Sequence, residues 1–421
     1  MDDRERERIR QKKLRRRRVR RIKKMIRLGV VLILLITLIV TLFSCSKKKN
    51  EDNKEPQNQD AVTEETDDTS VEDVYVEPEI DLIMVGDILL HDSIHESGKL
   101  DDGTYNYDHM FEQVKEDVQA ADLAIVNQEV ILGGKELGLT GYPSFNGAFE
   151  VGDSLVDAGF DVVLHATNHA LDKGKTALLN CIDYWETSHS EVGVLGIYDS
   201  QEDYENNVYI YEQDGIKIGI LNYTYGTNGI PLPDGMPYAV GLLEEEKVIA
   251  DIKKANELAD FVVVCPHWGI EYQHVQNSDQ EYWANIFLEN GVDLVIGTHA
   301  HYIQPVDMLK NEAGDEMLVY WSLGNFINAT SGEGAGTSDR MVGGMAEVTI
   351  AKTEDGSVYI KNYGVEPLVT QLAYGPQEIT TYKLSDYTEA LASQNKVIEK
   401  DSAFSLEYCQ NLCEEVFGDL Y

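Results

Sequence analysis

The stretch Phe160-Asp-Val-Val-Leu-His-Ala-Thr-Asn-His169 passes from an apolar, strand-like run into an amide and an imidazole. The same order recurs along the chain: Ile80–Val85 precedes Asp87, Leu123–Val126 precedes Glu129, Phe261–Val264 precedes His267, and Leu294–Ile296 precedes His299 and His301. In α/β proteins the carboxyl ends of parallel strands meet at one edge of a sheet, where ligands bind. We therefore expect these side chains to share one site.

Helical patterns separate most of the strand-like runs, at Asp108–Ala121, Phe149–Ala158, Lys175–Thr187, Glu244–Ala259 and Gln280–Glu289. Alternation of strand and helix predicts an α/β fold with a parallel or mixed sheet. Beyond Gly343, the runs Met345–Ile350 and Val358–Tyr363 flank a turn and predict an antiparallel pair, which we expect to complete a second sheet. The segments Leu384–Glu399 and Phe404–Val416 then read as helices.

The donors after the strands have a composition typical of a metal centre. Two or three carboxylates or amides with three or four imidazoles match the ligand count of one or two divalent ions such as Mn, Fe or Zn. His299 and His301 are two residues apart, so an extended backbone would point both rings the same way. Two ions about 3.5–4 Å apart would suit a hydrolytic or group-transfer reaction.

Charge divides the chain into two unlike parts. The first fifty residues hold 18 Lys+Arg and 4 Asp+Glu, which leaves 17 basic and 70 acidic residues for the remainder, a net charge of −53. That remainder contains one arginine, Arg340, so it lacks the basic surface of a nucleic-acid-binding protein. Arg340 is its single guanidinium for binding a carboxylate or phosphate, and we take it as a hypothetical substrate-binding residue.

The N-terminus predicts attachment to a membrane. Residues 1–24 are basic and read as a cytoplasmic segment, and residues 25–44 are a transmembrane anchor or a lipoprotein signal that ends before Cys45. Residues 45–79 are acidic and polar and read as a disordered linker. Both alternatives predict a protein of the cell membrane with one spanning segment or a lipid anchor and an extracytoplasmic domain. We expect a folded domain over residues 80–371 and a helical extension over residues 372–421.

Six ordered motifs resemble those of the bacterial capsule synthesis protein CapA family, which includes poly-γ-glutamate synthesis and export proteins. They are Gly86-Asp-Ile88, Asn127-Gln-Glu129, Ala166-Thr-Asn-His-Ala-Leu-Asp-Lys-Gly174, His267-Trp-Gly-Ile-Glu-Tyr272, Gly297-Thr-His-Ala-His301 and Ser322-Leu-Gly-Asn-Phe326. The resemblance covers roughly Ile80 to Phe326. It implies a relation to calcineurin-like metallophosphoesterases, whose fold is a sandwich of two mixed sheets flanked by helices.

Carried over by motif, the resemblance assigns roles to individual residues. The implied metal ligands are Asp87, Glu129, Asn168, His267, His299 and His301. His169 would be the general acid that protonates a leaving group. Residues that would support the ligands from behind are Asn127, Asp172, Glu271 and Asn325.

Two departures from the metallophosphoesterase pattern leave the activity open. Residue 89 is Leu where Asp-x-His is usual, and the bridging carboxylate would be Glu129 rather than Asp. The resemblance implies a role in synthesis, export or attachment of a capsular polymer such as poly-γ-glutamate, within a membrane synthase complex. A cell-surface phosphoesterase of other purpose and a non-catalytic scaffold are the alternatives.

Overall fold

The computed structural model describes residues 75–421 of the 421-residue chain. The predicted basic segment at 1–24, the predicted membrane segment at 25–44 and most of the predicted linker lie outside the described residues. Within residues 75–421, no helix combines the length and apolar character needed to cross a membrane.

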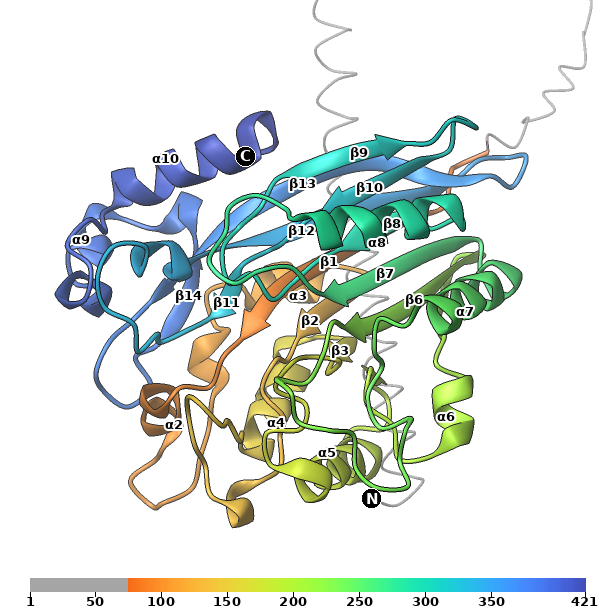
Figure 1. The fold of residues 1–421 in the computed structure, drawn as a ribbon. Helices are drawn as coiled ribbons and strands as arrows, with labels where there is room; N and C mark the ends of the chain where they lie inside the picture. Colours follow the sequence, from red (N-terminus) through yellow and green to blue (C-terminus); the bar gives the residue numbers. More distant parts are fainter. Residues whose placement is uncertain (1–74) are drawn as a thin grey trace, which may run out of the picture. The chain divides into compact units, whose positions relative to one another are not determined.

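Two mixed β-sheets form the centre of the domain (Figure 1). The first sheet contains eight strands, ordered β14-β13-β12-β1-β2-β3-β4, with β11 also pairing with β1. These strands are β1 (Glu79–Ile88), β2 (Leu123–Asn127), β3 (Val162–Leu164), β4 (Gly193–Leu195), β11 (Asn325–Ile327), β12 (Val342–Lys352), β13 (Val358–Gln371) and β14 (Thr380–Lys383). Strands β1 to β4 are parallel, whereas β12 to β14 are antiparallel to their neighbours.

The second sheet contains six strands in the order β5-β6-β7-β8-β10-β9. They are β5 (Tyr209–Gln213), β6 (Ile216–Thr224), β7 (Phe261–His267), β8 (Leu294–Ile296), β9 (Val306–Lys310) and β10 (Glu316–Tyr320). Strands β6, β7, β8 and β10 are parallel to one another, and β5 and β9 close the two edges in antiparallel fashion.

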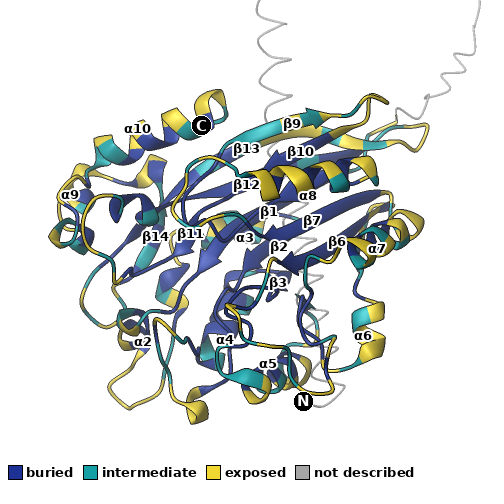
Figure 2. Ribbon diagram, in the orientation of Figure 1, coloured by how far each residue is buried: buried dark blue, intermediate teal, exposed yellow. Residues whose placement is uncertain are grey.

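Helices flank the sheets. They are α2 (Asp92–Gly98), α3 (Lys115–Ala120), α4 (Phe149–Ala158), α5 (Gly174–Ser188), α6 (Gln201–Glu205), α7 (Glu245–Leu258), α8 (Ser278–Glu289), α9 (Glu389–Ala392) and α10 (Leu406–Phe417). Helices α7 and α8 pack on the second sheet, and α10 packs on β13 of the first. Figure 2 shows that the central strands are buried, while β9, the first half of β13 and the outer faces of these helices are partly or fully exposed. An α/β fold with two sheets is thus confirmed.

The second sheet buries both of its faces, as the alternation of its residues predicts. Ile216, Ile218 and Ile220 of β6 belong to the core cluster that also contains the first sheet. Leu221 and Tyr223 belong to a separate cluster with α7 and α8. The continuous apolar runs of these strands therefore follow from burial on two sides.

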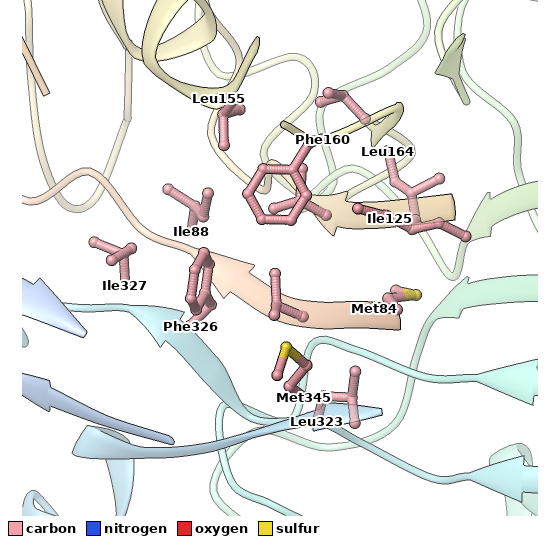
Figure 3. Packing of buried hydrophobic residues seen from close by; sticks show 14 of the residues in the cluster. Met84, Ile88, Ile125, Leu155, Phe160, Leu164, Leu323, Phe326, Ile327 and Met345 are labelled. Atoms are coloured by element: carbon pink, nitrogen blue, oxygen red, sulfur yellow. The ribbon is translucent and has the colours of Figure 1, made fainter. Parts of the chain in front are cut away.

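Strand β1 lies at the centre of the main core (Figure 3). Side chains from β1, from helix α4 and from the β11–β12 region gather there, including Ile88, Leu155, Phe326 and Met345. Close contact between backbones fixes the end of β1: a Cβ added at Gly86 would lie 2.0 Å from the carbonyl oxygen of Gly324. Only glycine fits there, so the carboxylate that follows it is held in one place.

The C-terminal part differs from the expectation. Strands β12 and β13 do not complete a second sheet; β12 pairs with β1 in register Leu82 to Val348, so both belong to the first sheet. Residues 372–421 are not only helical, because β14 extends that same sheet. Leu384–Glu399 is broken into short turns of helix, since Thr388 and Asn395 each cap a new one.

The expected helix Asp108–Ala121 is also broken. Asp108–Met110 is a 3-10 turn, and α3 begins only at Lys115. Between them, the N–H of Phe111 donates to the carbonyl of Asp108 and the N–H of Val114 to that of Phe111. The side chains of Phe111 and Val114 are buried in the core.

Candidate metal centre

The six predicted ligands converge where strand ends of the two sheets meet. Asp87 is the penultimate residue of β1, Glu129 follows β2 and Asn168 follows β3. From the second sheet, His267 ends β7, and His299 and His301 follow β8. All six are buried, with exposed fractions of 5% or less. The predicted shared site is therefore present as a cluster of side chains; their roles as ligands stay a prediction.

Glu129 lies between two groups of possible ligands. One group is Asp87, Glu129 and His267; the other is Glu129, His299 and His301; within each group the ligand atoms lie within 4.8 Å of one another. The Oε1 atom of Glu129 is 3.6 Å from Nε2 of His267 and 3.7 Å from Nε2 of His301. A carboxylate shared in this way is the arrangement that two neighbouring ions need.

Buried polar atoms without partners show that the residues present fit a divalent ion. Both carboxylate oxygens of Glu129 and Nδ1 of His299 are buried and lack a hydrogen bond within the described residues. An unpaired buried carboxylate is costly, so such atoms are expected to have an external partner. Imidazole nitrogens with carboxylate and amide oxygens suit Mn, Fe or Zn.

Opposing electrostatic effects act on the two histidines after β8. Burial lowers the pKa of His301, but the charges of Glu129 and Asp87 outweigh it and raise the pKa to about 9. Burial, together with the charges of His267 and His301, holds the pKa of His299 well below its usual range. Burial thus favours the uncharged form of the His299 ring, whereas an ion bound at His301 would have to displace its proton.

Asp87 is fixed by several donors. Its Oδ1 accepts a hydrogen bond from Nδ2 of Asn127 at 2.8 Å, and its Oδ2 accepts one from the backbone N–H of His299 at 3.2 Å. Nδ1 of His301 lies 3.1 Å from both Asp87 Oδ2 and Asn325 Oδ1. Asn127 and Asn325, predicted as supporting residues, therefore both touch the cluster.

His267 is held from both sides of its ring. Nδ1 lies 2.9 Å from the hydroxyl of Thr298, and Nε2 lies 2.9 Å from Oδ1 of Asn168. Sequence reasoning missed Thr298, although it lies within the Gly297–His301 motif. Thr167, which precedes Asn168, also contributes without having been predicted. Its hydroxyl donates to the carbonyl of Glu129 and accepts from the N–H of His169.

His169 faces the cluster and is oriented from behind by Asp172. Nδ1 of His169 lies 2.7 Å from Asp172 Oδ2, which also accepts a hydrogen bond from the N–H of Phe145. Nε2 of His169 points toward the predicted ligands, 3.8 Å from Glu129 Oε1. The Phe145 ring and the imidazole of His169 pack edge to face, with their ring centroids 4.7 Å apart. The arrangement leaves Nε2 as the nitrogen that can exchange a proton with a substrate.

The loop after β8 has a backbone conformation that differs from the expected extended one. His299 has φ 93° and His301 has φ 57°, so the backbone is bent and not extended. Left-handed conformations are rare for residues with side chains and are found at functional sites. The two rings, with centroids 5.8 Å apart, converge because of these bends.

The remaining predicted residues lie around a cavity of about 520 Å³ beside the cluster. Glu271 and Arg340 line it together with Leu89, which stands where an Asp-x-His motif would place an imidazole. Glu271 acts on the cluster through its charge, which is one of the smaller contributions to the raised pKa of His301. His91 also lines the cavity, and burial lowers its pKa to about 4.

His189 is not one of the predicted ligands and is held by two carboxylates. It lies at the end of α5, with Nε2 2.6 Å from Asp153 Oδ1 and Nδ1 3.9 Å from Glu191 Oε1. Burial alone would lower the pKa of His189, but the two carboxylates have the larger combined effect and raise it to about 9.

Relatives were found by sequence and by structure. The capsule biosynthesis protein CapA of Bacillus anthracis is 27% identical over 256 residues, 58% of this chain and 59% of that protein. The PGA biosynthesis protein CapA of Bacillus subtilis (strain 168) is 28% identical over 176 residues, 41% of this chain and 44% of that protein. The chain thus spans about half the length of these curated relatives. Among solved structures, the NAD nucleotidase NadN of Haemophilus influenzae has a TM-score of 0.45 at 13% identity, covering 81% of this chain and 67% of that one.

A family model provides the broadest match. The model of the bacterial capsule synthesis protein PGA_cap matches residues 81–330, which include every residue of the metal cluster. This range is more than half of the 421 residues. The chain belongs to the bacterial capsule synthesis protein family.

Proposed function

We propose that this chain is a metal-dependent hydrolase or transferase of the metallophosphoesterase type, acting in the synthesis, export or attachment of a capsular polymer. The observation that carries the proposal is Glu129, a buried carboxylate without a hydrogen bond in the described residues, shared by two groups of ligands. The two-sheet fold and the donors at its strand ends agree with a calcineurin-like sandwich.

The residues divide the chemical work. Asp87, Glu129 and His267 would hold one ion, and Glu129, His299 and His301 the other, with Asn168 beside His267. Bound there, divalent ions polarise a phosphoryl or carbonyl oxygen and lower the pKa of water. Their neighbours already hold Asp87 and His267 in place.

His169 would deliver a proton to the leaving group from Nε2. The carboxylate of Asp172 keeps the Nδ1 proton in place by accepting it in a hydrogen bond, which sets the tautomer and the ring orientation. With Nδ1 directed at Asp172, Nε2 is the nitrogen left to face a leaving group. Asp172 therefore acts as a positioning residue.

The names of the relatives support a capsular polymer, and the Bacillus subtilis protein is named for PGA biosynthesis. We propose poly-γ-glutamate as the polymer and a membrane synthase complex as the partner. The basic residues 1–24 and the apolar residues 25–44 support an anchor in the cell membrane with the domain outside it.

One observation favours a scaffold without activity. Leu89 occupies the position of the imidazole in the usual Asp-x-His motif, so one ion would have fewer ligands. An Asp87→Ala variant separates the two functions: a scaffold keeps its capsule phenotype, whereas an enzyme loses it.

Metal content and turnover of the full chain test the proposal. Elemental analysis should find one or two equivalents of Mn, Fe or Zn, and hydrolysis of a generic phosphodiester should be abolished by a chelator and by His169→Ala. The His169→Ala protein should keep its metal. Folded wild-type protein without metal, or with turnover that survives chelation, would refute the proposal.

A further inference from the structure

The cavity beside the metal cluster has a basic wall in a strongly acidic protein. It reaches His169 and His301 of the cluster on one side and Arg340 on the other. Arg340 is the only arginine after residue 50, and no ion pair joins it to a carboxylate in residues 75–421. With 70 acidic residues after residue 50, an arginine without an acidic partner is unexpected.

The guanidinium of Arg340 is nevertheless held firmly. Nη1 donates a hydrogen bond to Oγ1 of Thr330 at 2.9 Å, and the guanidinium carbon lies 3.9 Å from the centre of the Tyr272 ring. Its buried Nε has no hydrogen-bond partner within the described residues. An oriented guanidinium that keeps unused donors is suited to a carboxylate or phosphate.

A second cation approaches the same wall. Nζ of Lys400 donates to the carbonyl oxygen of Thr330, the residue whose hydroxyl binds Arg340. Burial lowers the pKa of Lys400, Glu333 opposes this, and the charge of Arg340 adds to the lowering. Two cations held this close repel each other, and an anion between them would relieve the repulsion.

Tyr272, which supports the guanidinium, has a strained backbone. Its φ is 63°, and its N–H donates to the carbonyl of Ala300 at 2.7 Å, which ties it to the metal-binding loop. Its ring centre lies 5.9 Å from that of His301. A strained residue between Arg340 and a predicted metal ligand indicates that their spacing matters.

Asn328 adds an unused acceptor to the cavity. It is 1% exposed, lines the cavity, and its Oδ1 has no partner in the described part of the chain. Its Nδ2 donates to the carbonyl of Arg340 at 3.2 Å, which fixes which end of the amide is the oxygen. Oδ1 is therefore available to an N–H or O–H donor of a ligand.

The acidic groups nearby do not neutralise Arg340. Asp339 accepts a hydrogen bond from Tyr408 and faces His274 at 3.6 Å. Glu271 lines the cavity. Burial is the largest cause of the raised pKa of Tyr272; the charge of Glu271 adds to the rise, and the charge of Arg340 opposes it. Glu271 would repel an anion, whereas the charges of Arg340 and Lys400 would attract it.

We propose that this cavity binds an oxyanion, carboxylate or phosphate, that the substrate carries beside the bond cleaved at the metal centre. Arg340 is its cationic ligand, Tyr272 positions the guanidinium, and Asn328 accepts an adjacent N–H or O–H. The substrate class is thus an acidic molecule with a second anionic group. The inference rests on the proposed function for the identity of the reacting bond, but binding of the oxyanion can be measured without turnover.

The test is calorimetric titration of the full, metal-loaded chain with glutarate and, separately, with inorganic phosphate. Arg340→Gln should weaken binding of the preferred anion by about 10- to 100-fold, because one charge-assisted interaction is lost. Tyr272→Phe should bind like the wild type, whereas Tyr272→Ala should bind more weakly. Lys310→Gln is the matched control, since Lys310 is an exposed cation paired with Glu316 on β9 and β10.

The two anions distinguish the possible sources of the oxyanion. Stronger Arg340-dependent binding of glutarate assigns a carboxylate, and stronger Arg340-dependent binding of phosphate assigns a phosphate. Equal binding of both anions by wild type and Arg340→Gln, at unchanged metal content, would overturn the inference. Anion binding that depends on metal but not on Arg340 would also overturn it. Absence of metal-dependent turnover would refute the proposed function alone.

Discussion

Replacement of Glu129 by glutamine should abolish most of the stabilisation that divalent metal gives to the protein. The carboxylate belongs to both ligand groups, and each of its oxygens lacks a hydrogen bond within residues 75–421. The amide has nearly the same shape, so packing is preserved while the shared negative charge is lost. Both ions should bind more weakly.

The size of the effect follows from mass action. Metal at 100 times its dissociation constant stabilises the native state by about 2.7 kcal/mol. At about 2.1 cal/mol/K per residue, the unit Glu77–Tyr421 has an unfolding entropy of about 0.7 kcal/mol/K, so Tm should rise by about 4 °C. If affinity falls about 100-fold, the same metal concentration gives only about 0.4 kcal/mol, a rise below about 1 °C.

Thermal unfolding followed by circular dichroism, with and without metal, measures this difference. Glu347→Gln is the control, because Glu347 is an exposed carboxylate on β12 outside the ligand groups. It should retain the full rise in Tm. A metal-dependent rise in Glu129→Gln equal to that of the wild type would refute the assignment of Glu129 as the shared ligand.

Three further predictions concern other residues. Asp172→Asn should lower kcat about 10- to 100-fold without changing metal content, and the loss should be greater for poorer leaving groups, because His169 is no longer oriented; equal losses for all leaving groups would contradict this. Gly86→Ala should destabilise the protein by at least about 1–3 kcal/mol in urea unfolding, since the added methyl group meets a backbone oxygen at 2.0 Å; an unchanged midpoint would disprove the close approach. The raised pKa of His189, about 9, means that its stabilisation is complete below about pH 6.5 and is lost as pH rises through about 9. Wild type should therefore lose about 1 kcal/mol more than His189→Gln over that range, after allowance for solvent screening, and parallel pH profiles would exclude the effect.

Much of the site was predictable because its residues follow apolar runs in the sequence. The positions of Asp87, Glu129, Asn168 and His267 required only that neighbouring strands end at one edge. The motif spacing was enough to identify the family, which the family model confirms. Periodicity works best for such buried, regular strands, because burial itself selects the apolar residues.

Other features depend on contacts that local sequence does not record. The pairing of β12 with β1 joins residues more than 250 positions apart, and nothing in Met345–Ile350 says which sheet it enters. The bend at His299 brings its N–H within hydrogen-bond distance of Asp87, a residue far away in sequence. The surroundings of Arg340 likewise need Tyr272 and Lys400 to be placed together.

The position of the metal centre between the two sheets has a consequence for how the protein acquires its ion. Asp87 and Glu129 come from one sheet and the three histidines from the other, so neither ligand group exists until both sheets have assembled. Stable binding of an ion at either group would then require the folded domain. Because protein ligands of this kind bind several first-row metals and availability decides among them, an ion bound there would come from the compartment in which the folded chain resides.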